Sequence, residues 1–128
     1  MTTNLQPAFN GAAGTYTHDN LIGGTAVNAV TESIVLDTGN LTRGALLGRI
    51  TASGKYVLSL SAATDGSEVP VAILAEDTDA TSADKTTIAY FTGEFNATAM
   101  TFGTGHTAAS TQAGLRDLGI FLKTNLAA

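Results

Sequence analysis

The sequence predicts a mainly β fold with one short C-terminal helix: a compact small barrel or sandwich-like domain that carries an extended N-terminal arm. Three observations favour this class. The chain has 128 residues, the length of one domain. From Ile34 onward, short apolar runs alternate with turn clusters, as in small all-β folds. One segment near the end carries both a helix start signal and a helix stop signal.

Residues 1–28 are interpreted as an arm, and the single folded domain then spans residues 29–128. Glycines interrupt every short apolar cluster of the arm, and Pro7 lacks a backbone donor. The apolar residues of the arm follow neither a helical nor a strand period, so no core face is evident. We expect the arm to be mobile in the isolated protein. A leader without a role is the alternative interpretation.

The first three predicted strands are short and regularly spaced. They cover residues 34–36, 45–50 and 56–60, and each ends at a cluster of turn residues. The cluster after the third strand contains Asp65 and Gly66, and the glycine supplies the turn conformation. Such regular spacing is typical of a small barrel or sandwich.

Two further stretches extend the predicted sheet. The continuous apolar run 69–75 suits a strand buried on both faces, although Pro70 confines its first residues to an edge or a bulge. Residues 86–91 and 94–97 also have strand character. They flank Gly93, which we interpret as a hairpin or bulge glycine.

One helix is predicted after residue 106. Thr107 or Ser110 can accept hydrogen bonds from the free amides at its start, and Gly119 is placed as a left-handed cap at its end. Gly114 weakens the helix without excluding it. Residues 120–123 are apolar enough to form a final strand, so the helix is an insertion in a mainly β chain.

Charge and composition exclude several classes of protein. Lys and Arg total 6 against 11 Asp and Glu, which gives a net charge of -5 and a pI near 4.6. This sign does not suit phosphate neutralisation, so we expect no nucleic-acid partner. The chain has no Cys, which excludes disulfides, thiolate metal sites and a cysteine nucleophile. We see neither a membrane span nor a signal peptide, and expect a soluble protein made in the cytoplasm and no membrane partner.

Few residues suit catalysis or metal binding. His18 and His106 are the only histidines, and no G-x-S-x-G nucleophile motif occurs, so a hydrolase is not favoured. Residues 76–79 and Asp84 form an acidic stretch that lacks the glycine and the distal glutamate of a calcium loop. A solvated acidic loop is the better interpretation. We therefore predict no catalytic residue, no cofactor and no metal site.

Several motifs, taken in order, resemble a known family. They are GALLGRIT at 44–51, AATDGSEVPVAILAED at 62–77, FTGEF at 91–95 and LRDLGIFLK at 115–123. Together they resemble the lambda-like phage head decoration proteins over about residues 30–123. The Asp-Gly turn that leads into an apolar Ala-Ile-Leu strand is the most specific part of this resemblance.

The resemblance implies a structural protein without enzymatic activity. It implies a homotrimer at local threefold axes on the outer surface of an expanded phage head. There the trimer would cement neighbouring subunits of the major capsid protein and stabilise the head. The protein would be made in the host cytoplasm and located on the virion. Family members of this kind use an N-terminal arm that orders on the capsid.

The resemblance also directs the choice of candidate site residues. An arm that adds a strand to an exposed capsid edge gains main-chain hydrogen bonds, while its apolar side chains fill pockets. The candidates for capsid binding are Leu5, Pro7, Phe9, Tyr16, His18, Leu21 and Ile22. Val69 and Pro70 are the candidates for the trimer interface. Leu115 and Leu118 share one helix face, and we expect both to serve the domain core.

Two other functions stay open at this point. A carbohydrate-binding, adhesin-like β module on a virion or cell surface would need a pocket with exposed aromatic side chains. A small hydrolase would need a site centred on His18 or His106.

Overall fold

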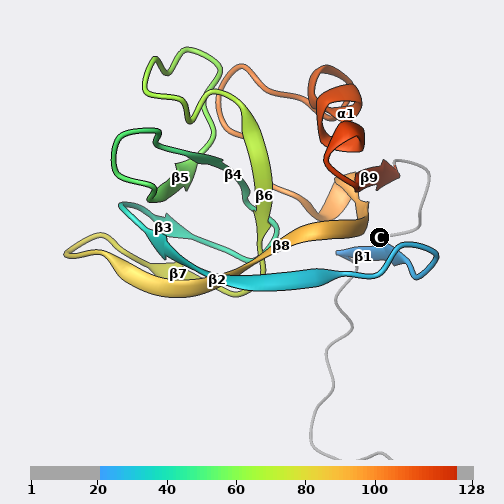
Figure 1. Cartoon of the computed structure of the whole chain (residues 1–128), viewed down its shortest axis with the longest axis horizontal. Coiled ribbons are helices and arrows are strands. Elements are labelled where there is room, and N and C mark those ends of the chain that lie inside the picture. The colour runs from blue at the N-terminus through green and yellow to red at the C-terminus, as the bar shows by residue number, and fades with distance from the viewer. Residues whose placement is uncertain (1–20, 124–128) are drawn as a thin grey trace, which may run out of the picture.

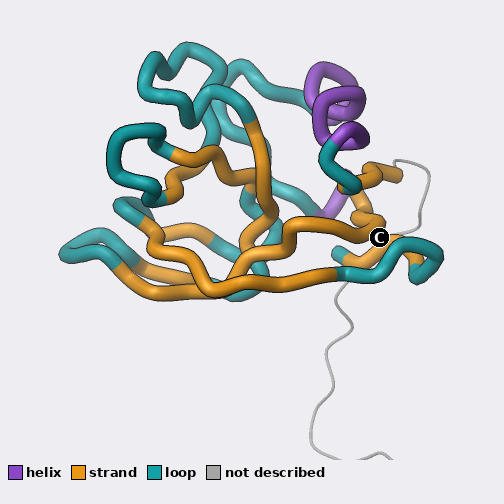
Figure 2. Tube along the Cα trace, in the orientation of Figure 1, coloured by secondary structure: helices purple, strands orange, loops and turns teal. Residues whose placement is uncertain are grey.

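The computed structural model describes residues 21–123, whose strands curl into a barrel-like sheet with a helix at one end (Figure 1). In chain order the elements are β1 (Ile22–Gly24), β2 (Val30–Leu36), β3 (Asn40–Leu41), β4 (Leu46–Arg49), β5 (Tyr56–Leu58), β6 (Pro70–Leu74), β7 (Thr78–Asp79), β8 (Lys85–Asn96), a 3-10 helix (Ala97–Ala99), α1 (Ala108–Asp117) and β9 (Ile120–Lys123). Long loops separate the short strands on the side of the molecule that carries the helix (Figure 2). The expected mainly β class with one short C-terminal helix is confirmed.

The barrel is a ring of strands closed through β8. β2 pairs with β5 in parallel, β4 lies antiparallel between β5 and β6, and β8 lies antiparallel between β6 and β2. Beyond this ring, the C-terminal half of β8 pairs with β1 and, in parallel, with β9. β3 and β7 form a separate two-stranded sheet. The expected small barrel is therefore present, and β8 is the strand that holds its parts together.

Two apolar clusters lie on opposite faces of β4 and β6. Leu46 and Ile73 belong to the cluster beneath α1 and β9. Leu47, Ala72 and Leu74 belong to the cluster inside the other half of the barrel. Successive strand residues point to opposite faces, so β6 is buried on both sides, as its apolar run predicts. Pro70 is the first residue of β6, a position that needs no ladder donor.

β8 corrects the prediction for the region around Gly93. The structure has one continuous strand of 12 residues there, so the hairpin alternative is wrong. The register between β2 and β8 shifts next to Phe91, which places an irregularity near the glycine but no turn. Gly93 has a φ of +139°, and a Cβ atom there would lie 2.9 Å from the ring of Phe95. Close packing, together with this φ, is what requires a glycine.

The helix ends are set by the side chains that the sequence singles out. The amide of Ser110 donates to Thr107 Oγ1 at 3.0 Å, and the amide of Thr107 donates to Ser110 Oγ at 2.9 Å. Both candidate caps thus act together as a capping box around the first turn. Gly119 has a φ of +90° after the last turn, as expected for a left-handed cap. β9 follows at once over the predicted range.

The folded unit includes part of the predicted arm. Leu21 is 1% exposed and packs in the cluster beneath α1. Its carbonyl accepts a hydrogen bond from the backbone N–H of the buried residue Asn96 at 2.7 Å. β1 follows and pairs with Phe95 and Glu94 of β8. Leu21 and β1 therefore pack with the folded domain, because a partner strand about 70 residues away supplies a core face that the local pattern lacks.

Candidate functional site

An apolar groove separates the start of β6 from α1. The groove has a volume of about 230 Å³, and its apolar walls are formed by Val69, Pro70, Val71, Gly114, Leu115 and Leu118. We refer to these residues as the α1–β6 groove. Val69 is 57% exposed and Leu118 is 45% exposed, so two of the side chains that line the groove leave aliphatic surface uncovered. The two predicted trimer-interface residues therefore lie in one apolar surface feature.

The buried face of α1 fixes one wall of the groove. Leu115 is 1% exposed and packs in the core, which confirms its expected role. Gln112 Nε2 donates to the carbonyl of Leu122 at 3.3 Å and ties the helix to β9. Leu118 follows the helix as its C-cap and lies at the surface, so the expectation that it serves the core is wrong. A Cβ atom at Gly114 would meet nothing within 4 Å, so the groove is open over the middle of the helix.

His106 lies beside the groove and closes a hydrogen-bond chain between loops. Ser59 is fully buried, and its hydroxyl donates to the carbonyl of Ser67 at 2.7 Å. His106 Nε2 lies 3.1 Å from both Ser59 Oγ and the carbonyl of Glu68. The Glu68 carbonyl can only accept, and the hydroxyl proton of Ser59 goes to Ser67, so Nε2 carries a proton that it donates toward both oxygens. A protonated Nε2 cannot take the proton of Ser59, so this pair does not form an activated nucleophile.

The carboxylates of the acidic stretch 76–84 each bind a different donor of the protein. Asp77 Oδ1 accepts from the amide of Arg43 at 2.8 Å. The hydroxyl and amide of Thr81 hold the pKa of Asp79 below its ordinary value. Lys55 forms an ion pair with Asp84 and lowers the pKa of that carboxyl. Within residues 21–123, no three His, Cys, Asp or Glu side chains are grouped so that they could hold a metal ion.

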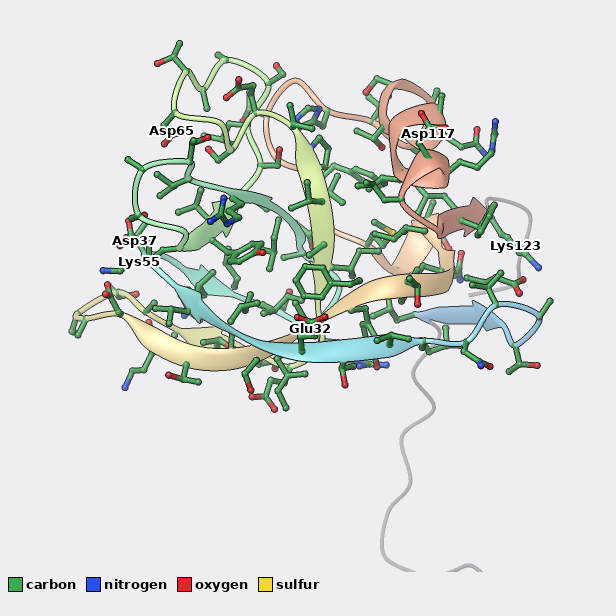
Figure 3. The ribbon with its side chains drawn as sticks, viewed as in Figure 1. Glu32, Asp37, Lys55, Asp65, Asp117 and Lys123 are labelled. Atoms are coloured by element: carbon green, nitrogen blue, oxygen red, sulfur yellow. The ribbon has the colours of Figure 1, made fainter. Side chains whose placement is uncertain are left out.

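Charged side chains are distributed around the described surface rather than gathered on one face. Figure 3 places Asp65 in the loop at the upper left, Asp117 on α1 at the upper right and Glu32 on β2 near the middle of the view. Lys55 approaches Asp37 to 4.0 Å in addition to Asp84, as an exposed ion pair. Within residues 21–123, no helix is long and apolar enough to cross a membrane.

The predicted capsid-binding residues fall into two groups. Leu21 is buried in the core, where its side chain offers no surface to a partner, and Ile22 is 37% exposed on β1. Ile22 borders a second cavity of about 210 Å³ between β1, the 25–29 connection and Tyr90. The remaining candidates lie outside the described residues; they are Leu5, Pro7, Phe9, Tyr16 and His18.

One charged residue of the structure is missed by the sequence analysis. Glu94 lies in β8 with only 5% of its surface exposed, and its carboxylate pairs with Lys123 of β9. The one signal in the sequence is its position between Gly93 and Phe95 in an otherwise apolar stretch. A single carboxylate in such a stretch does not by itself name its partner.

The comparison with protein families agrees with this architecture. The family described as bacteriophage lambda head decoration protein D matches residues 11–121, which is most of the chain. The chain belongs to this family. A search of curated proteins finds no match. Membership in the lambda head decoration protein D family assigns a structural role in decorating the phage head and places the protein on the virion capsid. It also confirms the resemblance stated from the motifs.

Proposed function

We propose that this member of the decoration protein family binds as a homotrimer to the outer surface of the expanded capsid at local threefold axes. There it cements neighbouring major capsid subunits without enzymatic activity. The observation that carries the trimer is the α1–β6 groove, where Val69 and Leu118 are about half exposed. A domain of this size leaves about a third of its surface in water, and in a cyclic trimer a different surface of the next copy covers the groove of each copy.

The N-terminal segment supplies a second kind of contact in this proposal. Residues 1–20 precede β1, which is the outermost strand beside β8. An extended segment that adds a strand to a capsid edge forms main-chain hydrogen bonds, and residues such as Leu5, Phe9 and Tyr16 fill pockets between them. Three such segments on one trimer raise the overall affinity by about 10²–10⁴ over a single contact. Individually weak contacts are then sufficient for cementing.

The surface of the described chain disfavours the carbohydrate-binding alternative. Among residues 21–123, the exposed large hydrophobic side chains are all aliphatic. Tyr56 and Phe91 border a cavity of about 340 Å³, but their rings pack edge to face with centroids 6.1 Å apart. They pack on each other instead of offering a flat face to a sugar ring.

Co-sedimentation with phage heads tests the proposal. Expanded heads stripped of decoration are mixed with the full chain and with a chain that lacks residues 1–20, and unexpanded heads serve as the control. We expect saturable binding of the full chain to expanded heads only, at a level equimolar with the capsid subunit, since three copies occupy each local threefold axis. The truncated chain is expected to bind at least about 100-fold more weakly. Absence of binding by the full chain would reject the decoration role and lead to a glycan screen.

A further inference from the structure

A cavity of the barrel brings a carboxylate close to two aromatic rings. The cavity has a volume of about 340 Å³, and Glu32 of β2, Tyr56 of β5 and Phe91 of β8 are among the residues that line it. We refer to these three residues as the Glu32 site. The site shares no residue with the α1–β6 groove, so it is a separate feature of the surface.

Strand pairing explains why these side chains meet. Side chains alternate across a strand, so Glu32 lies on the same face of β2 as the buried Leu36. Tyr56 is the partner of Leu36 in the sheet. Glu32 is the partner of Ala89, and Phe91 shares the face of Ala89 on β8. The apolar inner face of the barrel therefore ends at an exposed carboxylate with two rings beside it.

The carboxylate of Glu32 has no partner within the described chain. Among the carboxylates of residues 21–123, those of Glu32 and Asp117 have neither a hydrogen bond nor an ion pair, whereas each of the others has at least one. Asp117 ends α1 and lines none of the cavities described above. Glu32 thus combines an unpaired negative charge with a cavity.

Two cations of the described chain lie near the cavity without pairing with Glu32. Nη2 of Arg49 lies 3.2 Å from the position that a Cβ atom would take at Gly54, which lines the cavity. Lys55 follows Gly54 in the chain, and its ammonium pairs with Asp84. The charge of Glu32 is therefore left for a ligand, and Arg49 opposes a cationic ligand only from the Gly54 wall.

Tyr56 and Phe91 add aromatic surface to this charge. Both rings are partly exposed, and they stand at 83° to each other with centroids 6.1 Å apart, so their faces meet at a corner. A sugar ring needs one open flat face, whereas a compact cation fits a corner. Aromatic faces carry negative potential and attract a cation within about 6 Å of the ring centroid. The carboxylate and the rings together favour a small organic cation.

We propose that the Glu32 site binds an alkylammonium group, the group at the end of a lysine side chain. The ammonium donates hydrogen bonds to the carboxylate of Glu32, and the adjoining methylene groups pack on the rings of Tyr56 and Phe91. This inference goes beyond the proposed function, because it is drawn from the cavity alone and does not assume that the protein binds a head.

Titration of the full-length protein with n-butylammonium, followed by NMR, tests the proposal. We expect saturable shifts of the ring signals of Tyr56 and Phe91 with a Kd of about 10 mM or below, which corresponds to one ion contact and one cation–aromatic contact at a partly exposed site. Neutral 1-pentanol has a similar size but no charge, so it should bind at least about 5-fold more weakly. Equal binding of the two compounds, or no saturable shift with n-butylammonium, would overturn the proposal.

Charge variants show whether Glu32 is the binding group. Glu32→Gln keeps the shape of the side chain and removes its charge, so it should weaken n-butylammonium binding about 5-fold. Arg49→Gln removes the cation near Gly54 and should strengthen binding. Asp117→Asn removes the other unpaired carboxylate and serves as the matched control, with no change expected. An unchanged Kd in Glu32→Gln would reject the site.

Head binding distinguishes two sources of the ammonium, a lysine side chain of the head and a free alkylamine. If a lysine of the head occupies the site, Glu32→Gln weakens binding to expanded heads and n-butylammonium competes with the wild type for them. If n-butylammonium binds but both head-binding results equal those of the untreated wild type, the ligand is a free alkylamine. If the wild type does not bind heads at all, the decoration role fails, whereas the result of the titration stands.

Discussion

The placement of Leu21 predicts a sharp difference between two truncations. Removing residues 1–20 leaves both core clusters intact, whereas removing residues 1–28 also deletes Leu21 and β1. Loss of a fully buried leucine costs about 2–5 kcal/mol when a cavity remains. The backbone N–H of Asn96 also loses its acceptor, the carbonyl of Leu21, which costs about 1–3 kcal/mol. The longer truncation should therefore be about 3–8 kcal/mol less stable than the shorter one, a large part of the stability of a domain this size.

Urea unfolding monitored by circular dichroism measures this difference directly. The comparison is between the two truncated chains, so any effect of residues 1–20 themselves cancels. Leu21→Ala in the shorter truncation serves as a matched variant and should account for about 2–5 kcal/mol of the loss. Equal unfolding midpoints and slopes for the two truncations would refute the assignment of Leu21 and β1 to the folded unit.

Three further predictions concern packing, assembly and pH. Gly48→Ala should destabilise the protein by about 3 kcal/mol, because the new Cβ would lie 1.9 Å from the backbone oxygen of Ser67. Gly114→Ala should stabilise the helix by about 0.5–1 kcal/mol, because the space around Gly114 is open. Thermal unfolding of the two variants measures both effects. Val69→Ser combined with Leu118→Ser should shift the protein toward monomer in sedimentation velocity, because each change removes about 1 kcal/mol of apolar burial per copy. An unchanged trimer would exclude the groove as the interface. The stability advantage of the wild type over Glu94→Gln should be complete above about pH 4.5 and should vanish as the pH falls through the lowered native pKa of Glu94; a constant difference in urea midpoint down to pH 2 would contradict this sign.

Elements governed by local chemistry could be predicted from the sequence. Thr107, Ser110 and Gly119 fix the two ends of α1 through hydrogen bonds and backbone conformation within one turn of the helix. The apolar run of β6 likewise implies burial on both faces, whatever its partners are. For α1, the contacts that fix the ends lie within a few residues of each other in the sequence. For β6, the apolar run predicts burial without identifying the strands that pair with it.

The remaining features depend on contacts between distant residues. Leu21 belongs to the core because β8 lies beside it, and Leu118 is exposed at the C-cap, after the last helical residue. Position 93 requires a glycine because a Cβ atom there would lie too close to the ring of Phe95, and this contact cannot be inferred from the preference of glycine for turns. The sequence indicates Val69 and Pro70 as trimer candidates, and only the fold places Leu118 in the same groove.

The position of β8 has a consequence for how the protein is made. β1, β2, β6 and β9 all pair with this one strand. Ile22 of β1 pairs with Phe95, so β1 can join the sheet only after Phe95 has been added to the chain. During synthesis the earlier strands therefore leave the ribosome without their main partner, and the sheet can close only after residues 85–96 have emerged. Folding dominated by such distant pairings is slow and concerted. A chain interrupted before residue 85 therefore lacks the strand that joins β1, β2 and β6, and its barrel cannot close.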